Sequence, residues 1–211
     1  MASAARWNHY SKIYNFFLQA ADNMRQSQFA LLDQQQIWHH SPLNIYIAGA
    51  GTGLDVPYLA TRLKPNSQLT LIDFSADMLA KADKLIQQQQ YPWQITTKVG
   101  RAEQSELADQ SCDLVLLHLV LAVTSTPQEL LTEIVRVLKP NGIISLWDKF
   151  LPDGQQASFC RKSIDKITTA LGTTINLRLQ DLIAPLPLTI EQHQFCHWGL
   201  MQQVVLRKTT T

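Results

Sequence analysis

The chain has 211 residues, of which 45% are hydrophobic and 17% charged, and its formal net charge of +1 leaves no basic field for binding nucleic acid. A domain of this length buries roughly 70% of its unfolded surface. The three cysteines follow no metal-binding spacing, and no apolar run approaches the ~20 residues of a membrane span, so we expect a cytoplasmic single-domain protein with free thiols and no metal site.

The first forty residues favour helix, because Ile13, Phe17 and Met24 fall near one face of a 3.6-residue period. Pro42 ends this region. The stretch 16–32 could also lie on a bilayer surface, although it carries few Lys and Arg residues.

Strands and helices then alternate along the chain. Five strands are predicted, at 45–48, 69–72, 95–99, 113–117 and 143–147, the first of them a short apolar run. Helices are predicted between them, over 54–63, 73–86 and 126–138. Such alternation predicts an α/β fold, with a mostly parallel sheet covered by helices on both faces.

Local signals mark the helix ends. Ser75 is a good N-cap, and Thr126 with Glu129 predicts a capping box, with Pro127 at the first helical position. The sequence KPNG at 139–142 predicts a turn before the fifth strand.

The end of the chain departs from this alternation. Residues 155–172 look helical, and 181–188 look like a loop because of their two prolines. The segments 189–198 and 200–207 flank a Trp-Gly pair and predict an antiparallel hairpin at the sheet edge.

The turn GAGTG, after the first strand, brings Gly49, Gly51 and Gly53 to the start of a helix, where backbone N–H groups can face a ligand. Asp73 ends the second strand about twenty residues later, where a carboxylate can accept both hydroxyl hydrogens of a ribose. Alternatively, the turn holds nothing and Asp73 only starts a helix. A dinucleotide site would need a glycine where Leu54 stands, which weakens a nicotinamide interpretation.

Together, the segments GAGTG, LIDFSADML, CDLVLLHLVL and EIVRVLKPNGIISLWD resemble the class I S-adenosylmethionine-dependent methyltransferases. More narrowly, they resemble the branch that contains ubiquinone/menaquinone C-methyltransferases and bacterial phosphatidylethanolamine N-methyltransferases. The resemblance covers residues 7–150 and, more weakly, the final hairpin. It implies a Rossmann-like methyltransferase fold, S-adenosylmethionine as cofactor, S-adenosylhomocysteine as product, and a small-molecule or lipid acceptor of amine or quinone-like type.

The resemblance also assigns positions in the cofactor site. It implies that Gly49, Gly51 and Gly53 pack against the methionine part and the ribose, and that Asp73 binds the ribose. The family usually has an acidic residue two places before the first glycine. Ile47 stands there in this chain.

For the adenine, the resemblance implies flanking by Phe74 and Met78, which could instead be plain packing residues. The family often reads Gly-Asp-Ala after the third strand, where this chain has a glycine followed by Arg101 and Ala102. The Ala102 N–H could still meet the adenine ring. Arg101 cannot accept a hydrogen bond, and Glu103 is a substitute acceptor.

His118 ends the fourth strand, where the family places a residue near the sulfonium and the acceptor. We interpret it as a candidate catalytic base for an amine acceptor, with a purely structural role as the alternative. The N-terminal WNHYSKIYNFF resembles the family's lid segment, so Tyr14 or Tyr10 would cover the methyl donor unless they only pack in a helix.

These positions divide one domain, 1–211, into an N-terminal helical lid (1–40), a cofactor-binding core (41–150) and a substrate-side helix with a C-terminal hairpin (151–211). Two other functions stay open: a non-catalytic S-adenosylmethionine-binding scaffold, and a nicotinamide-dependent oxidoreductase. Nucleic acid methylation is not expected, because HLVLAV replaces an Asn/Asp-Pro-Pro-aromatic motif after the fourth strand. The sequence specifies neither the acceptor atom nor the oligomeric state.

Overall fold

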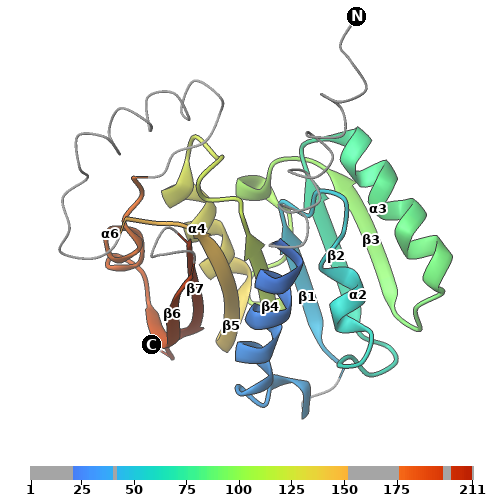
Figure 1. Cartoon of the computed structure of the whole chain (residues 1–211), viewed down its shortest axis with the longest axis horizontal. Helices are drawn as coiled ribbons and strands as arrows, with labels where there is room; N and C mark the ends of the chain where they lie inside the picture. Colours follow the sequence, from blue (N-terminus) through green and yellow to red (C-terminus); the bar gives the residue numbers. More distant parts are fainter. Residues whose placement is uncertain (1–20, 40–41, 152–175, 197–200, 211) are drawn as a thin grey trace, which may run out of the picture.

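A seven-stranded sheet in the order β3-β2-β1-β4-β5-β7-β6 runs through the centre of the computed structural model, which describes residues 21–39, 42–151, 176–196 and 201–210 (Figure 1). The strands are β1 (Asn44–Ala48), β2 (Gln68–Asp73), β3 (Gln94–Val99), β4 (Cys112–His118), β5 (Leu138–Lys149), β6 (Leu188–Cys196) and β7 (Met201–Lys208). Strands β1 to β5 are parallel, and β7 pairs antiparallel with both β5 and β6. The predicted parallel sheet and C-terminal hairpin are both confirmed.

Helices cover both faces of this sheet. They are a helix over residues 21–33, α2 (Val56–Leu59), α3 (Ala76–Gln89), α4 (Pro127–Val137) and α6 (Leu179–Ile183), with short 3-10 turns η1 (Ile37–His39) and η2 (Ala102–Gln104). Helix 21–33, α2 and α3 pack on one face, and α4 and α6 pack on the other. No helix among the described residues is long and apolar enough to cross a bilayer.

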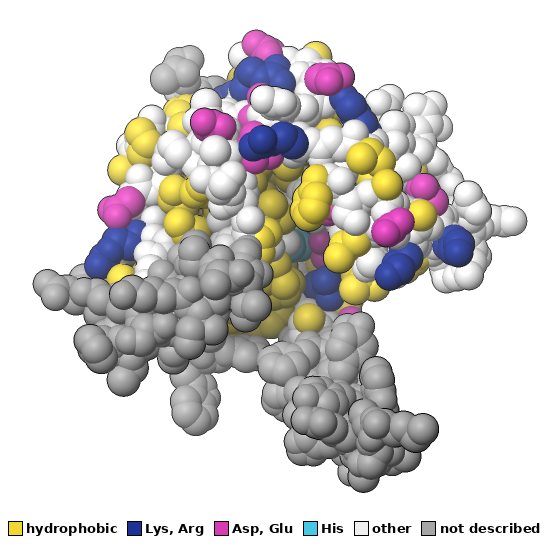
Figure 2. Space-filling view, turned by 90° about the horizontal axis from the view of Figure 1, so that it is seen from above, with side chains coloured by type: hydrophobic (Ala, Val, Ile, Leu, Met, Phe, Trp, Pro, Cys, Tyr) yellow, Lys and Arg dark blue, Asp and Glu magenta, His cyan; other side chains and the backbone are white. Residues whose placement is uncertain are grey.

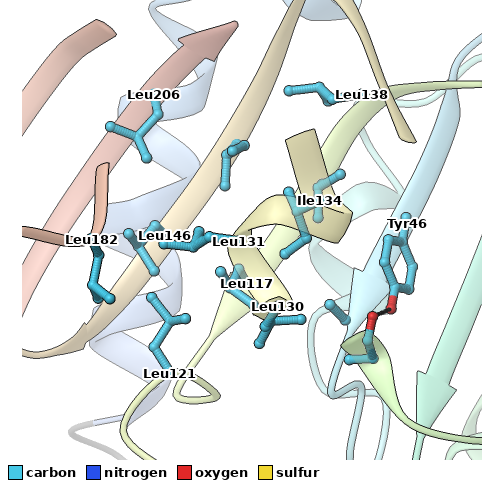
Figure 3. Close-up of a cluster of buried hydrophobic side chains, with 14 of the residues drawn as sticks. Tyr46, Leu117, Leu121, Leu130, Leu131, Ile134, Leu138, Leu146, Leu182 and Leu206 are labelled. Carbon is cyan, nitrogen blue, oxygen red and sulfur yellow. Dashed lines mark hydrogen bonds between the residues drawn. The ribbon is translucent and has the colours of Figure 1, made fainter. Parts of the chain in front are cut away.

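The face under α4 holds the larger apolar core (Figure 3). Leu130, Leu131 and Ile134 recur at helical spacing on α4, and all three are fully buried. Burying such side chains stabilises the fold by about 1.5–3 kcal/mol each. Tyr46 is also buried there, and its hydroxyl donates to the Ala102 carbonyl at 3.1 Å, which satisfies its polar end and ties η2 to β1.

Three predicted elements have different bounds in the structure. The helix predicted over 54–63 is shorter, because after α2 the chain continues in tight turns with i→i−3 hydrogen bonds at Ala60 and Arg62. Residues 139–142 lie within β5, where Asn141 has φ of 62° and the register with β4 shifts. The loop predicted over 181–188 is wrong at its start, because α6 occupies 179–183.

The signals at the helix starts were partly right. Ser75 accepts a hydrogen bond from the Met78 N–H at 3.3 Å, as an N-cap should, and Pro127 begins α4. The capping box is wrong, because the Thr126 hydroxyl donates to Glu103 at 3.0 Å and makes no cap. The helix predicted over 155–172 lies outside the described residues.

Candidate functional site

The glycine turn and Asp73 are in direct contact. The Gly51 N–H donates to Asp73 Oδ2 at 2.8 Å, and the Ser75 N–H donates to Oδ1 at 2.9 Å. Asp73 is only 6% exposed, so these two bonds hold its carboxylate at the carboxyl end of β2. The two sequence motifs therefore form one site between β1 and β2.

The three glycines of the turn face different surroundings. All have positive φ, at 64°, 55° and 74° for Gly49, Gly51 and Gly53. A Cβ on Gly49 would lie 2.6 Å from a Val120 methyl, and one on Gly53 would lie 2.9 Å from the Ala82 Cβ. A Cβ on Gly51 would have only the Met78 sulfur near it, at 3.6 Å. Gly51 is therefore the glycine that opens onto free space.

Exposed apolar side chains flank this space. Phe74 is 80% exposed, Met78 45% and Val99 57%, and Val99 pairs with Asp73 across β2 and β3. Three such side chains beside a buried carboxylate can pack against a flat, largely apolar group. The sequence indicated Phe74 and Met78, but it did not single out Val99, which reads there as an ordinary strand residue.

The residues after β3 form a second side of the space. Arg101 is more than half exposed and pairs with Glu103 at 2.9 Å, and Ala102 begins η2, where a backbone N–H has no intrahelical partner. Burial raises the pKa of Glu103, but bonds from its own N–H, Arg101, Thr126 and Thr124 bring it below the ordinary value. One Glu103 oxygen serves these side chains, so the residue first of all holds the loop after β4.

A polar network lies beneath helix 21–33, at the carboxyl end of β4 and β5. His118 Nε2 is 2.9 Å from the Ser145 hydroxyl, and its Nδ1 is 3.1 Å from Asp55 Oδ2, off the line of an ideal hydrogen bond. Asp55 Oδ1 accepts from Arg25 Nε at 3.0 Å. Figure 2 views this end of the sheet and shows a hollow lined by hydrophobic side chains, with histidine, acidic and basic side chains at its floor.

Gln28 determines which atoms of this network donate hydrogen bonds and which accept them. Its Nε2 donates to the Val204 carbonyl at 3.1 Å and to Ser145 Oγ at 2.9 Å. Because the carbonyl can only accept, the atom that faces both partners must be the amide nitrogen. The Ser145 proton is then free to point at His118 Nε2, which leaves the ring proton on Nδ1, facing Asp55. Burial raises the pKa of Asp55, but neighbouring His118 and Arg25 bring it below its ordinary value.

Ser145, His118 and Asp55 stand in the order of a hydrolase triad, but the burial of Ser145 argues against that chemistry. Ser145 is 0% exposed in the middle of β5, and its oxygen already accepts the Gln28 hydrogen bond. A nucleophile must reach a carbonyl carbon, which this hydroxyl does not. The network instead fixes the His118 ring and docks helix 21–33 on the sheet.

The structure brings together Gly49, Gly51, Gly53, Asp73, Phe74 and Met78 at one place, and Arg101 and Ala102 follow the strand next to it. His118 lies at the end of β4, and Tyr10 and Tyr14 lie outside the described residues. Sequence reasoning missed Asp55, Ser145 and Gln28. Asp55 stands at the N-cap position of α2 without making a cap, and its partners are distant along the chain.

Asp148, fully buried on β5, holds the loop that follows β4. Its carboxylate accepts from the Ala122 N–H at 3.0 Å and the Lys149 N–H at 2.7 Å. Burial raises the pKa of Asp148 from 3.8 to about 6, in spite of these bonds. The folded protein therefore binds more protons than the unfolded chain between these two values, and this group's contribution to stability falls as pH rises through them.

Asp148→Asn is expected to remove this pH dependence. The quantity to compare is the free energy of unfolding of wild type minus that of the variant. By the linkage relation, this difference should be larger by about 1 kcal/mol at pH ~5 than at pH ~7.5. Urea denaturation of both proteins at the two pH values measures it, and the other carboxyl groups cancel because both proteins share them. The same difference at both pH values would contradict a raised pKa for Asp148.

Comparisons with known proteins agree with this arrangement. Residues 47–146 match the family model described as a methyltransferase domain. A demethylmenaquinone methyltransferase from Lactobacillus johnsonii is 34% identical over 102 residues, which cover 48% of this chain and 42% of that protein. A phosphatidylethanolamine N-methyltransferase from Cereibacter sphaeroides is 24% identical over 153 residues, covering 72% of this chain and 73% of the relative. The chain thus spans less than half of the first relative's length.

Solved structures share the fold at low sequence identity. The [4+2]-cyclase SpnF aligns with a TM-score of 0.72 and 15% identity, covering 92% of this chain and 82% of that chain. Geranyl diphosphate C-methyltransferase from Streptomyces coelicolor, solved with S-adenosyl-L-homocysteine bound, aligns with a TM-score of 0.66 and 13% identity, covering 80% and 71%. Similarity at this level shows the Rossmann-like fold and leaves the reaction open, as the cyclase illustrates. Residues 47–146 are thus similar to methyltransferase domains, and the fold around them is the Rossmann-like fold of class I S-adenosylmethionine-dependent methyltransferases.

Proposed function

We propose that this chain binds S-adenosylmethionine between the ends of β1, β2 and β3 and transfers its methyl group to a small-molecule or lipid acceptor. The observation that carries the proposal is the Asp73 carboxylate, bonded to the Gly51 N–H at 2.8 Å beside a glycine with open space on its Cβ side. Such a turn admits a ligand close to the main chain, and the carboxylate supplies acceptors for a ribose.

The residues present fit this cofactor. A carboxylate offers about four lone-pair sites, and backbone N–H groups take two of those on Asp73, which leaves acceptors for two ribose hydroxyls. Phe74, Met78 and Val99 offer apolar surface for the adenine. Ala102 offers an N–H at the start of η2, and Arg101 can stack on the ring or point to solvent.

Ile47 marks the main departure from the family pattern. It is 1% exposed and packs in the core with its β-sheet neighbours Leu71 and Leu116. No carboxylate can therefore meet the cofactor's ammonium from this position. We propose that main-chain oxygen atoms of the turn bind that group in this chain.

When bound, S-adenosylmethionine supplies an activated methyl group on a sulfonium, so the protein's task is to orient and enclose the reactants. Orientation alone contributes about 7–11 kcal/mol in favourable cases. Helix 21–33 is well placed to exclude water, because Phe29 stacks on Tyr58 of α2 at 5.2 Å and Asp33 pairs with Arg62 at 2.7 Å. We propose the division into lid (1–40), core (41–150) and substrate-side part (151–211) on this basis.

We propose His118 as the proton acceptor if the methyl acceptor is an amine. In the tautomer set by Gln28, the lone pair that can take a proton is on Nε2, which the Ser145 hydroxyl positions at 2.9 Å. An imidazolium formed this way would be stabilised by Asp55, 3.1 Å from Nδ1.

His118→Ala is expected to lower kcat by about 100-fold and to flatten the acidic limb of the pH–kcat profile, the usual effect of losing a general base. Ser145→Ala removes the hydroxyl that positions Nε2, so kcat should fall in the same direction while the imidazole stays in place. Steady-state kinetics across pH measure both variants, with His118→Gln as a second replacement in case the alanine variant folds poorly. Unchanged turnover and pH profile in the His118 variants would remove the role.

The test of the function is calorimetric titration with S-adenosylmethionine, S-adenosylhomocysteine and NADH. We expect the first two to bind with Kd values of about 1–100 μM and NADH not to bind. NADH binding alone would favour the oxidoreductase, and binding of none of the three would overturn the proposal. S-adenosylhomocysteine formation with phosphatidylethanolamine or a demethylated quinone would distinguish an enzyme from a non-catalytic scaffold.

A further inference from the structure

Arg25 lies on helix 21–33, and the terminal nitrogens of its guanidinium group are unpaired within the described part of the chain. Its Nε donates to Asp55 Oδ1 at 3.0 Å, and its side chain is only 15% exposed. Neither of its two terminal nitrogens has a hydrogen-bond partner on any described residue. These two nitrogens are not among the fully buried unpaired atoms of the described residues, so the terminal fork is open to a ligand or to water.

Arg62 provides an internal comparison. Both arginines pair with an aspartate and lie over an aromatic ring, Arg62 at 5.2 Å from the Phe29 centroid and Arg25 at 5.9 Å from that of Trp147. Arg62 uses all three nitrogens, two on Asp33 and one on the Tyr58 carbonyl. All three Arg62 nitrogens therefore have partners within the fold, whereas only the Nε of Arg25 has a partner among the described residues.

The ring beneath Arg25 has an unpaired donor as well. Trp147 is 1% exposed, and its Nε1–H, which can only donate, has no partner. That N–H is itself buried, so the free donors that a ligand can reach are those of the Arg25 fork. The Arg25 fork matches the two oxygens of a carboxylate or phosphate.

The neighbouring wall is apolar. The hollow at this end of the sheet is lined by hydrophobic side chains (Figure 2), whereas Trp147, Met24 and Met201 are buried in a cluster of their own. The negative charge of Asp55 does not oppose an anion strongly, because its two oxygens already face Arg25 Nε and His118. An anionic head beside an apolar wall describes an amphiphile.

We propose that Arg25 is a specificity-determining residue that binds a carboxylate or phosphate group of the methyl acceptor, with the acceptor's apolar part against the hydrophobic lining of the hollow. The proposal rests on the proposed function, because it assigns this hollow to the acceptor. It narrows the acceptor to anionic amphiphiles and leaves the methylated atom open.

The test measures binding of dodecanoate, dodecyl phosphate and dodecanol to the full chain with S-adenosylhomocysteine present. These probes share an alkyl chain and differ in the head group, so they separate carboxylate from phosphate and both from a neutral group. We expect at least one anion to bind about tenfold or more tighter than dodecanol, with Arg25→Gln removing that preference. Arg62→Gln is the matched control and should retain it.

Binding of S-adenosylhomocysteine without any probe separates this proposal from the proposed function. Arg25→Gln should bind it as wild type does, which also shows that the variant is folded. Equal binding of anions and dodecanol by wild type, no binding of either anion, or an anion preference that survives in Arg25→Gln would each overturn the role of Arg25. Failure of wild type to bind S-adenosylhomocysteine would instead overturn the proposed function.

Discussion

Asp73→Ala is expected to weaken S-adenosylhomocysteine binding by about 100-fold or more. A hydrogen bond to a charged group contributes about 1.5–3 kcal/mol, and the proposed site loses two, one for each ribose hydroxyl. The substitution also frees the Gly51 and Ser75 N–H groups, which now bond to the carboxylate at 2.8 and 2.9 Å, so the turn loses its anchor. Calorimetry on wild type and variant measures the change.

Asp77→Ala is the matched control, because Asp77 is an exposed acid four residues further on, in the first turn of α3. It should bind S-adenosylhomocysteine as wild type does, and Asp73→Asn should lie between the two because an amide keeps one acceptor oxygen. If Asp73→Ala binds the product as tightly as Asp77→Ala, the ribose does not sit at Asp73. The site would then have to be sought elsewhere on the sheet edge.

The parts of the fold that the sequence predicted are those with local signals. Strands β1 and β4 contain short apolar runs, and the glycine turn, Ser75 and Pro127 mark where helices begin. The misjudged elements had conflicting signals. Leu179, Leu182 and Ile183 are buried on α6 at helical spacing, but the prolines that follow suggested a loop.

Contacts between distant side chains could not be predicted. Thr126 sits where a capping box is expected, yet Glu103, on the loop after β3, takes its hydroxyl. Asp55 sits at a helix start, yet it faces Arg25 and His118 from two other elements. The partner of a polar side chain depends on which groups the folded sheet brings near. The motifs therefore predicted that the glycine turn and Asp73 lie together, as they do, but not the Arg25–Asp55–His118 contacts.

The spacing of the three glycines has a physical reason in the packing of α3. Gly53 approaches this helix so closely that a Cβ would lie 2.9 Å from the Ala82 Cβ and 3.3 Å from its backbone Cα. The neighbour is backbone and a methyl group, neither of which can rotate away. Gly53 thus serves helix packing, whereas Gly51 borders open space, and the two glycines should respond differently to the same substitution.

Gly53→Ala is expected to destabilise the fold by about 3 kcal/mol, from a left-handed φ that costs roughly 1–2 kcal/mol and an overpacked contact that costs at least as much. Gly51→Ala has a similar φ but no clash, so about 1 kcal/mol is expected from the backbone alone. Its added methyl stands in the proposed cofactor space, so S-adenosylhomocysteine binding should fall by about tenfold or more.

Thermal unfolding and calorimetry on the same two variants test this separation. Each kcal/mol shifts Tm by about 2–4 °C in a domain of this size, so Gly53→Ala should melt clearly below Gly51→Ala. Equal melting temperatures would mean that α3 shifts at Ala82 and relieves the overpacked contact. Wild-type affinity in Gly51→Ala would mean that the space beside Gly51 is not where the cofactor binds, even if Asp73 is required, because a ligand bonded to that carboxylate must pass within reach of this methyl group.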